Sequence, residues 1–431
     1  MTTSDNPLER PTRVAFVTQW FPPEPATIPL GLARALRSQG LNVDVLTGVP
    51  NYPTGRVSQG YSAWRRSTET REGFRIRRTP LYPSHDHSTL RRTANYLSYA
   101  ASSSLFGGAV LRAADVALVY SSPATAATAA MAARRRWGLP YVLMVMDLWP
   151  DSVFATGFLD RGPARRVAER GLHWFTDRTY RLAAHVTVTC PGMLEALVAR
   201  GVPRQKVSVV YNWADEKLMQ PTEPDPRLRA ELGLTDGFVI MYGGNLGVAQ
   251  RLDVAVRAMA ELRDLPDVHL VLVGDGIERP VLRALVDELK LRTVHFVDRV
   301  APERMAALAA AADLQLVSLA DEPLFRITMP SKVQSIMACG QALLVCAPGD
   351  AARAVENAGA GFTAPPGDSV GLAGIIRHAR RVPRRDLQAM GRNGRHHYLR
   401  VMSEEINSRH LADLLTSAAR PGVRSGTGEG R

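Results

Sequence analysis

Short runs of apolar residues alternate with helix-like segments along most of the chain. The first run, Arg13–Thr18, is followed by a helical pattern over Leu30–Gln39 and by a second apolar run over Val43–Thr47. The same alternation continues through the apolar runs Val116–Tyr120, Tyr141–Met146 and His185–Thr189, with a helical pattern over Pro123–Arg136. This order of strand, helix and strand predicts an α/β domain with a parallel sheet.

The pattern breaks over the polar, Pro-containing stretch 211–226 and then starts again. Later strands are expected at Phe238–Tyr242, Val268–Val273, Val294–Val297, Leu314–Val317 and Ala342–Cys346, with a helix over Val333–Cys339. The sequence therefore predicts two doubly wound domains, 1–212 and 213–402. A helix at 403–420 is expected to pack back toward the first domain, and the Gly-, Ser- and Arg-rich tail 421–431 to be disordered.

Length and composition agree with a globular protein of two domains. The 431 residues are 45% hydrophobic and 22% charged, which suits two cores of roughly 200 residues each. Neither a signal-peptide core nor an apolar run long enough to cross a membrane occurs, so a cytoplasmic protein is expected. The three cysteines lack any disulfide or zinc spacing.

The positive charge lies entirely in the first half. Residues 1–212 hold 26 Lys and Arg against 14 Asp and Glu, while the remainder holds 27 of each. This imbalance predicts an anionic partner, either a membrane surface or a phosphate-bearing acceptor, although a well-solvated arginine surface explains it too. The arginines 134–136, 161, 165 and 166 suit anionic lipid, and they lack the interleaved aromatic residues of a nucleic-acid site, so no nucleic-acid partner is expected.

Candidate ligand-binding residues follow strands of the second half. Tyr242–Gly247 and Gly274–Gly276 are glycine-rich strand ends, where backbone can approach a ligand closely. The segment Met329–Gly340 predicts a helix with Ser331 as N-cap, whose NH groups and Lys332 could hold a diphosphate. Considered alone, the same segment is also compatible with an ordinary capped helix.

Several motifs in a fixed order give the chain a family resemblance. In the second half they are GGNLG (243–247), VGDG (273–276), VHFVDRV (294–300) and MPSKVQSIMACG (329–340). In the first half they are VTQWFPPEPA (17–26), VLTGVPNYPTGRV (45–57), LYPSHDHSTLRRTANYLSYA (81–100), DLWPDS (147–152) and VVYNWAD (209–215). Together they resemble the family-4 glycosyltransferases, in particular the bacterial branch that builds surface polysaccharides and includes the fucosamine transferases of O-antigen assembly.

The resemblance implies a GT-B fold, in which two facing Rossmann-like domains bind nucleotide sugar in the second and acceptor in the first. The residues placed at the donor by this resemblance are Gly244, Asn245, Asp275, Gly276, Arg299, Val300, Arg326, Ser331, Gln334 and Ser335. Those placed at the reaction centre are Asp147, Asp151 and Lys332, and those placed at the acceptor are Asn51, His85 and Asp86.

The chain also departs from the family pattern. Met146 stands where the family often has a histidine, and Asn245 and Gln250 stand at positions of a cationic phosphate clamp. Ser335 replaces the ribose-binding glutamate. Positive charge at the donor must then come from Lys332, Arg326 or backbone dipoles, and Glu322 is a candidate substitute for a sugar-contacting acid.

The segment His85-Asp86-His87 lacks a third predicted ligand, so no metal site is expected there. Contact with the acceptor and an ordinary loop remain open for this segment.

The expected function is metal- and cofactor-independent transfer of a hexose or N-acetylhexosamine from a UDP-sugar to a lipid-linked or polysaccharide-precursor acceptor, with the anomeric configuration retained. Peripheral contact with an anionic membrane is part of this expectation. Alternatives are an acceptor among soluble or lipid-phosphate secondary metabolites, a non-catalytic nucleotide-sugar-binding subunit, and a sugar epimerase. The sequence leaves the oligomeric state open.

Overall fold

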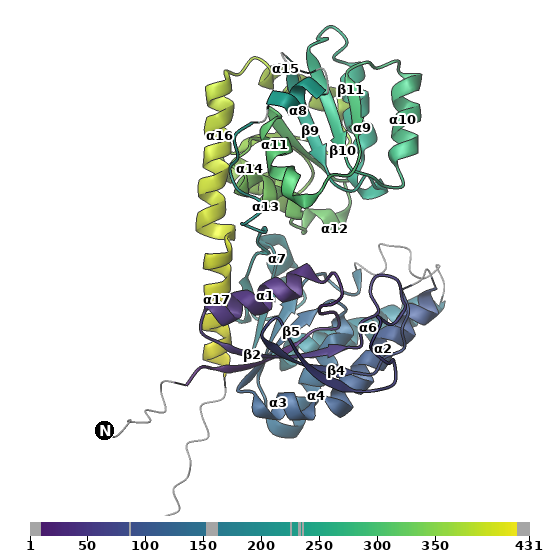
Figure 1. The fold of residues 1–431 in the computed structure, drawn as a ribbon, viewed down its shortest axis with the longest axis vertical. Coiled ribbons are helices and arrows are strands. Elements are labelled where there is room, and N and C mark those ends of the chain that lie inside the picture. Colours follow the sequence, from purple (N-terminus) through teal and green to yellow (C-terminus); the bar gives the residue numbers. More distant parts are fainter. Residues whose placement is uncertain are drawn as a thin grey trace, which may run out of the picture. The chain divides into compact units, whose positions relative to one another are not determined.

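The computed structural model describes residues 10–85, 88–151, 163–224, 226–231, 234 and 237–419. The chain forms two compact units (Figure 1). The first contains the residues up to Thr189, Met193–Val210 and the chain from Asn407 onward, and the second contains Cys190–Gly192 and Tyr211–Ile406. The chain therefore leaves the first unit and returns to it.

The first unit is built on an eight-stranded sheet in its described part, with the order β3-β4-β2-β1-β5-β6-β7-β8. The strands are β1 (Arg13–Val17), β2 (Asn42–Gly48), β3 (Ser67–Arg71), β4 (Phe74–Thr79), β5 (Val116–Ser121), β6 (Tyr141–Val145), β7 (His185–Val188) and β8 (Val207–Val209). Neighbouring strands are parallel except β3 and β4, which are antiparallel. The expected parallel sheet therefore has one antiparallel strand at its edge.

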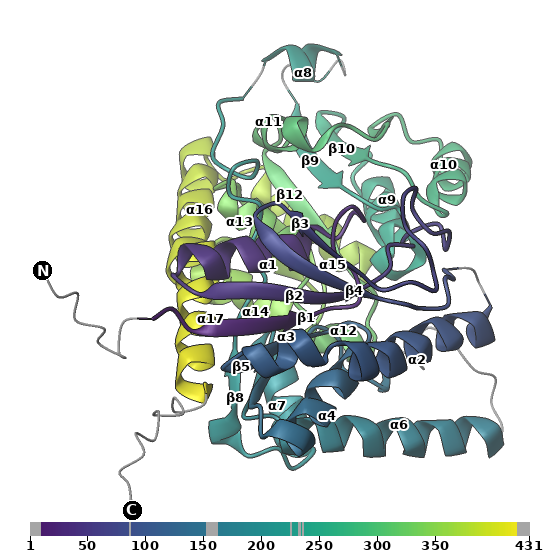
Figure 2. The ribbon, with the colours of Figure 1, turned by 60° about the horizontal axis from the view of Figure 1, so that its bottom comes forward.

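Helices cover both faces of this sheet. They are α1 (Thr27–Ser38), α2 (Thr89–Phe106), α3 (Gly108–Ala113), α4 (Ala127–Trp137), α6 (Pro163–Leu182), α7 (Pro191–Ala199) and α17 (Glu404–Ala418), with short 3₁₀ turns at Ala124–Ala126 and Arg204–Lys206. Helices α2, α4 and α6 lie side by side, and α1 lies across the sheet from them (Figure 2). Because both faces are covered, β5 and β6 are buried at every residue.

The second unit has a six-stranded, fully parallel sheet in its described part, with the order β11-β10-β9-β12-β13-β14. Its strands are β9 (Phe238–Gly243), β10 (Val268–Val273), β11 (Val294–Val297), β12 (Leu314–Ser318), β13 (Leu343–Cys346) and β14 (Gly361–Ala364). Its helices are α8 (Pro226–Glu231), α9 (Leu252–Ala260), α10 (Arg279–Glu288), α11 (Met305–Ala310), α12 (Pro323–Arg326), α13 (Ser331–Ala338), α14 (Asp350–Ala358), α15 (Ser369–Ala379) and α16 (Arg384–His397). The turns Val248–Gln250 and Pro302–Arg304 are 3₁₀ helices, and Tyr398–Met402 is a π-helix.

The core of the second unit follows the two-residue period of its strands. On β10, Leu270 and Leu272 pack into a cluster shared with α9, α10 and α15. Val271 and Val273 point the other way and pack with Leu308 of α11. Successive residues thus bury opposite faces of the sheet, as a doubly wound domain requires.

Most expected elements lie within a few residues of the observed ones, whereas β3, β4, β8 and β14 were not expected. Strand β3 lies at the edge of the sheet and does not need an apolar face, so its sequence Ser-Thr-Glu-Thr-Arg lacks the apolar pattern that would predict a strand. None of the helices in the described ranges has the length and apolar composition needed to span a bilayer. The expected disordered tail 421–431 lies outside the described residues.

Candidate functional site

Two glycine-rich turns meet at the carboxyl edge of the second sheet, where β9 and β10 end. The Gly244 amide donates to the Val273 carbonyl at 2.9 Å, and the Leu246 amide donates to the Asp275 carbonyl at 2.9 Å. Gly274 has a φ of +132°, and a Cβ there would lie 2.0 Å from the Gly244 oxygen. The two turns are therefore packed backbone against backbone, which only glycine allows.

Lys332 of α13 lies beside these turns. Its Nζ is 4.9 Å from the centre of the Tyr242 ring, and a Cβ on Gly244 would come within 2.9 Å of that nitrogen. The Tyr242 hydroxyl donates to the Asn245 carbonyl at 2.7 Å, which ties the ring to the same turn. Burial lowers the pKa of Lys332, and its amine has no acidic partner within the described part of the chain. An anionic ligand would supply the missing partner.

Ser331, Lys332 and Ser335 line a cavity of about 170 Å³ together with Gly243 at the end of β9. The helix begins one residue earlier than expected: Pro330 occupies the N-cap position and Ser331 is the first helical residue. The expectation that Ser331 caps the helix is therefore wrong, since no side chain caps α13. Instead, the Ser331 side chain is exposed at the helix start, where free NH groups also point.

The other residues expected at the donor surround the same edge. The Asn245, Asp275 and Arg299 side chains are exposed, and Val300 is half-buried. Asp275 accepts a hydrogen bond from the Gly276 amide at 2.8 Å, within its own turn. The structure thus places these residues on the turns after β9, β10 and β11, which are adjacent strands.

Three further candidates near the donor turns are engaged by the protein or buried. Arg326 pairs with Asp321 at 2.8 Å, and both side chains are well exposed. Gln250, which stands at a clamp position, accepts a hydrogen bond from the Gly247 amide at 3.1 Å. Gln334 is 2% exposed and is not among the residues that line the Lys332 cavity. Lys332 is therefore a cation that the structure places directly against the turn at Gly244.

Asp147 and Asp151 follow β6 in the first unit and differ in their surroundings. The Asp147 side chain keeps a solvent-exposed side, yet the protein packed around it raises the pKa of its carboxyl. Within the described residues this carboxyl makes no hydrogen bond or ion pair. Asp151 instead forms an ion pair with Arg200, which also donates to the Trp149 carbonyl at 3.3 Å. Asp151 therefore helps to hold the loop after β6.

The residues expected at the acceptor also differ from one another in burial and in contacts. His85 is half-buried and packs against the Tyr52 ring at 4.7 Å, and burial lowers its pKa. Asn51 is only 2% exposed, donates to the Val49 carbonyl and accepts from Asn95. Asn51 therefore helps to hold its own loop in place, and its contact with the acceptor stays a prediction. Asp86 and His87 lie outside the described residues.

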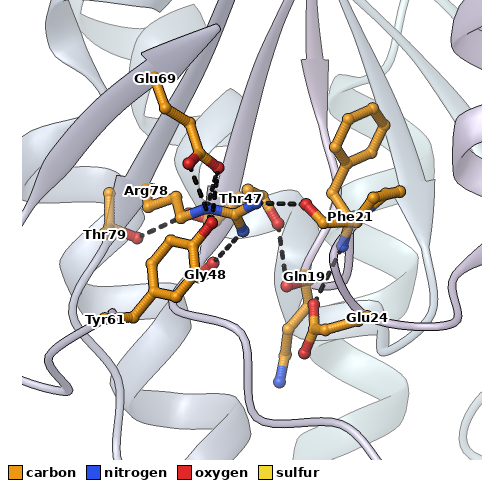
Figure 3. A network of polar contacts seen from close by, with 10 residues as sticks. Gln19, Phe21, Glu24, Thr47, Gly48, Tyr61, Glu69, Arg78 and Thr79 are labelled. Carbon is orange, nitrogen blue, oxygen red and sulfur yellow. Dashed lines mark hydrogen bonds and ion pairs between the residues drawn. The ribbon is translucent and has the colours of Figure 1, made fainter. Parts of the chain in front are cut away.

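A buried acid that the sequence analysis missed, Glu24, joins two loops at the same edge of the first sheet. Its carboxylate is 4% exposed and accepts from the amides of Phe21, Asn51 and Tyr52 at 2.8–3.1 Å. Burial raises its pKa to about 6 despite these bonds and the nearby guanidinium of Arg78. Figure 3 shows Glu24 beside the network around Arg78.

Arg78 is itself completely buried, and its guanidinium joins several segments. It donates to Glu69 at 2.7 Å, to the Gly48 carbonyl at 3.1 Å and to the Pro22 carbonyl (Figure 3). Hydrogen bonds to one buried acid, Glu24, and one buried base, Arg78, thus hold the loops after β1 and β2 in place.

Comparisons with known proteins agree in both halves. The glycosyl transferase 4-like domain matches residues 25–213, and the glycosyl transferases group 1 domain matches residues 237–380. The chain belongs to the family-4 glycosyltransferases. An Escherichia coli K12 protein named as the colanic acid biosynthesis glycosyl transferase WcaI is 28% identical over 315 residues, which cover 71% of this chain and 75% of its own. The glycosyltransferase WbjE of Pseudomonas aeruginosa is 28% identical over 62% of this chain and 66% of its own.

The fold of this glycosyltransferase is GT-B. The Anabaena protein HepE, solved with UDP and glucose, superposes with a TM-score of 0.65 at 21% identity, covering 94% of this chain and all of its own. The expected α/β architecture of two Rossmann-like domains is therefore confirmed.

At the carboxyl edge of each sheet lies a residue that the sequence motifs did not identify: Tyr242 in the second unit and Glu24 in the first. Tyr242 was read only as a strand end, and its role appears once Lys332 lies over its ring. Glu24 sits within a Pro-rich turn, and its burial depends on loops that are distant in sequence. A charged residue inside a turn with prolines on both sides was the one available signal.

Proposed function

We propose that this glycosyltransferase moves a hexose or N-acetylhexosamine from a UDP-sugar to a lipid-linked or polysaccharide-precursor acceptor. The observation that carries the donor assignment is the Lys332 amine, held without an acidic partner among the described residues, against Gly244 and the start of α13. A diphosphate at this place would meet one cation, the free NH groups of a helix start and the NH groups of the glycine turns.

The choice of UDP rests on structural neighbours together with this site. Crystal structures of HepE contain UDP, UDP with glucose, and UDP-glucose. In this chain, Arg299 and Val300 follow β11, the edge strand beside β10, and so lie next to the glycine turns. We propose that their backbone holds the base and that Asn245, Asp275, Gly276 and Ser335 contact the remainder of the donor.

The proposed reaction retains the anomeric configuration. The acceptor hydroxyl oxygen bonds to the anomeric carbon on the face that UDP leaves, and the bond from that carbon to the diphosphate oxygen breaks. The hydroxyl proton passes to the departing phosphate, whose charge Lys332 and the α13 amides stabilise. In this scheme Asp147, with its raised pKa, orients the acceptor hydroxyl, and neither a metal nor a cofactor takes part.

The proposed acceptor is anionic or carried on a lipid, at the cytoplasmic face of a membrane. WcaI is named for colanic acid biosynthesis, and the first half of this chain holds the whole excess of positive charge. Arg134, Arg135 and Arg136 are exposed at the end of α4. The neighbouring helices expose large apolar residues, namely Leu90, Leu97 and Leu105 on α2 and Val167 and Trp174 on α6. This combination favours binding to an anionic bilayer.

The donor assignment is tested by thermal shift and slow hydrolysis across UDP-, GDP- and dTDP-sugars, with and without EDTA. We expect one UDP-sugar to raise Tm and to release UDP at the same rate with EDTA. Lys332→Ala should weaken both effects, whereas the exposed Lys290→Ala should not. Binding without hydrolysis or transfer would instead support the nucleotide-sugar-binding subunit, which the serine at 335 makes the second candidate. Once an acceptor is turned over, NMR of the product's anomeric proton reports retention.

The membrane assignment is tested by flotation with phosphatidylglycerol and phosphatidylcholine vesicles. We expect binding to the anionic vesicles at low salt and release at 1 M salt, because exposed charges are then screened. Replacing Arg134, Arg135 and Arg136 by Glu should abolish flotation. The same change at three exposed arginines of the second unit, Arg292, Arg304 and Arg381, is the matched control.

A further inference from the structure

Five aromatic rings form a continuous row along the carboxyl edge of the first sheet. The row runs His85, Tyr52, Trp20, Tyr96 and Trp149, with successive ring centres 4.7, 5.5, 6.5 and 6.1 Å apart. Four of these residues follow the parallel strands β4, β2, β1 and β6, and Tyr96 lies on α2. All five side chains are half-buried, so each keeps part of its surface open to solvent. We call this set the aromatic row.

Three buried amides hold the middle of the aromatic row. Gln19 donates to Asn95 at 2.6 Å, and Asn95 donates to Asn51 at 3.2 Å. Each of these residues directly precedes a ring of the row, since Trp20, Tyr96 and Tyr52 follow them in the sequence. All three amides are no more than 2% exposed.

The acid Glu24 extends this support to Tyr52. Its Oε1 accepts from the backbone amides of Asn51 and Tyr52, both at 2.8 Å. A buried hydrogen-bonded network of this kind fixes side chains in one arrangement, so the aromatic row is preorganised. Isolated packing contacts between rings would not need such a network.

Unused polar groups lie in and next to the row. Gln19 Oε1 and Ser84 Oγ are buried without a hydrogen-bond partner, and each belongs to a residue directly before a ring of the row. The indole NH groups of Trp20 and Trp149 and the hydroxyl of Tyr52 make no hydrogen bond within the described residues. Buried polar atoms without partners are rare, because each carries an unrecovered desolvation penalty.

We infer that the aromatic row is the acceptor subsite and that it binds the face of a pyranose ring. This inference rests on the proposed function and specifies its acceptor as a carbohydrate. The C–H bonds of one sugar face carry slight positive charge and pack against the negative faces of aromatic rings. The hydroxyls at the rim of the sugar would then meet the unused polar groups.

A sugar fits these features better than an alkyl or isoprenoid chain does. An apolar chain would leave the indole NH groups and the Tyr52 hydroxyl without partners on binding. Asp147 lies two residues before Trp149, whose amide donates to the Asp147 carbonyl at 2.9 Å. The carboxyl proposed to orient the acceptor hydroxyl is therefore on the same loop as one end of the row.

The test measures transfer from the UDP-sugar identified above to a panel of octyl glycosides of glucose, galactose, mannose and N-acetylglucosamine. Trp20→Ala and Tyr96→Ala should each raise the acceptor KM by about tenfold, which corresponds to a loss of about 1.4 kcal/mol of binding free energy from the missing aromatic contact. Hydrolysis of the donor in the absence of acceptor should keep its wild-type rate. Trp20→Phe should recover most of the affinity, and Trp64→Ala, which removes a highly exposed ring of the same unit outside the row, should change nothing.

Three outcomes would overturn the inference. One is an acceptor KM that stays at the wild-type value in Trp20→Ala and Tyr96→Ala while both variants keep the wild-type Tm. Another is a parallel loss of donor hydrolysis and transfer, which indicates a structural role. The third is competition by 1-octanol as strong as by octyl glucoside, which indicates a chain-binding surface.

Failure of the proposed function gives a different result. If the wild type neither binds nor hydrolyses any nucleotide sugar, saturation-transfer NMR with methyl glycosides still reports sugar contact with the aromatic row. A signal that Trp20→Ala abolishes would support the row as a sugar site, whereas absence of signal at millimolar sugar would reject it.

Discussion

The carboxyl edges of the two sheets are built in different ways: the main chain forms the edge in the second unit, and side chains form it in the first. In the second unit, backbone approaches backbone at Gly244 and Gly274, and one cation, Lys332, lies alongside. In the first unit, the corresponding edge is lined by side chains: five aromatic rings above three buried amides and one buried acid. The second edge therefore depends on the absence of side chains, and the first on their identity.

This difference teaches which edge can change its ligand. Backbone NH groups and a helix start recognise a diphosphate in any sequence that keeps the turns close together. Ring faces and amides recognise a particular shape and pattern of hydroxyls. Substitutions at the first edge should alter selectivity for the ligand, whereas substitutions of the glycines at the second edge should weaken ligand binding and stability together.

The largest effect is expected from Gly274→Ala. An added Cβ would lie 2.0 Å from the Gly244 oxygen at a φ of +132°, so the two turns must separate. We expect a loss of about 3–4 kcal/mol in the free energy of unfolding, measured by denaturant titration. Gly374→Ala is the control: it lies in α15 with nothing within 4 Å of the new Cβ, and it should stabilise by about 0.5–1 kcal/mol. Equal effects of the two changes would contradict the packed-turn interpretation.

Lys332→Met should separate stability from function. Because burial lowers the pKa of this amine, folding disfavours its charged form, and removing the charge should leave Tm unchanged or higher. Affinity for UDP should fall by about tenfold to a hundredfold, the usual effect of a lost charge-assisted hydrogen bond. Calorimetric titration with UDP and a thermal scan without it measure both effects. A variant that loses stability while keeping UDP affinity would show that Lys332 is structural.

Glu24→Gln should change how stability depends on pH. The carboxyl has a pKa of about 6 in the folded protein and 4.5 ordinarily, so between these values the folded state binds more protons than the unfolded state. The contribution of Glu24 to the free energy of unfolding therefore falls as pH rises through this window, by about 2 kcal/mol in total. Glutamine does not titrate, so the wild type should lose about that much relative to the variant between pH 4 and pH 7.5. Denaturant titrations at several pH values measure this difference, and Glu195→Gln, a change at an exposed position, is titrated in parallel as the control.

The smallest effect is expected at the Asp151–Arg200 pair, which is partly exposed. Asp151→Asn should lower the free energy of unfolding by less than about 1 kcal/mol, and a double-mutant cycle with Arg200→Gln should recover a coupling of similar size. Asp147→Asn should reduce kcat more than Asp151→Asn does. If Asp151→Asn instead lowers kcat strongly at unchanged stability, Asp151 acts in the reaction rather than in its loop.

The sequence predicted the sheets well because buried parallel strands are continuous apolar runs, such as Val116–Tyr120 and Val268–Val273. It missed β3 because an edge strand needs no apolar face. Lys332 could be identified because its motif is local. The contacts of Asn51, Glu24 and the aromatic row join segments up to 76 residues apart, and no local pattern records them.

The return of the chain into the first unit at Asn407 affects how such enzymes can be recombined. Leu411 and Leu415 of α17 are fully buried, and Ser408 accepts a hydrogen bond from Gln39 at 3.1 Å. A fragment ending near residue 210 would lack this helix and expose the surface it covers. In the sequence, the segment Tyr211–Ile406 is therefore an insertion within the first unit. Exchanging it between relatives requires two crossovers, near residues 211 and 406, and a chimera made with one crossover would combine mismatched halves of a single core.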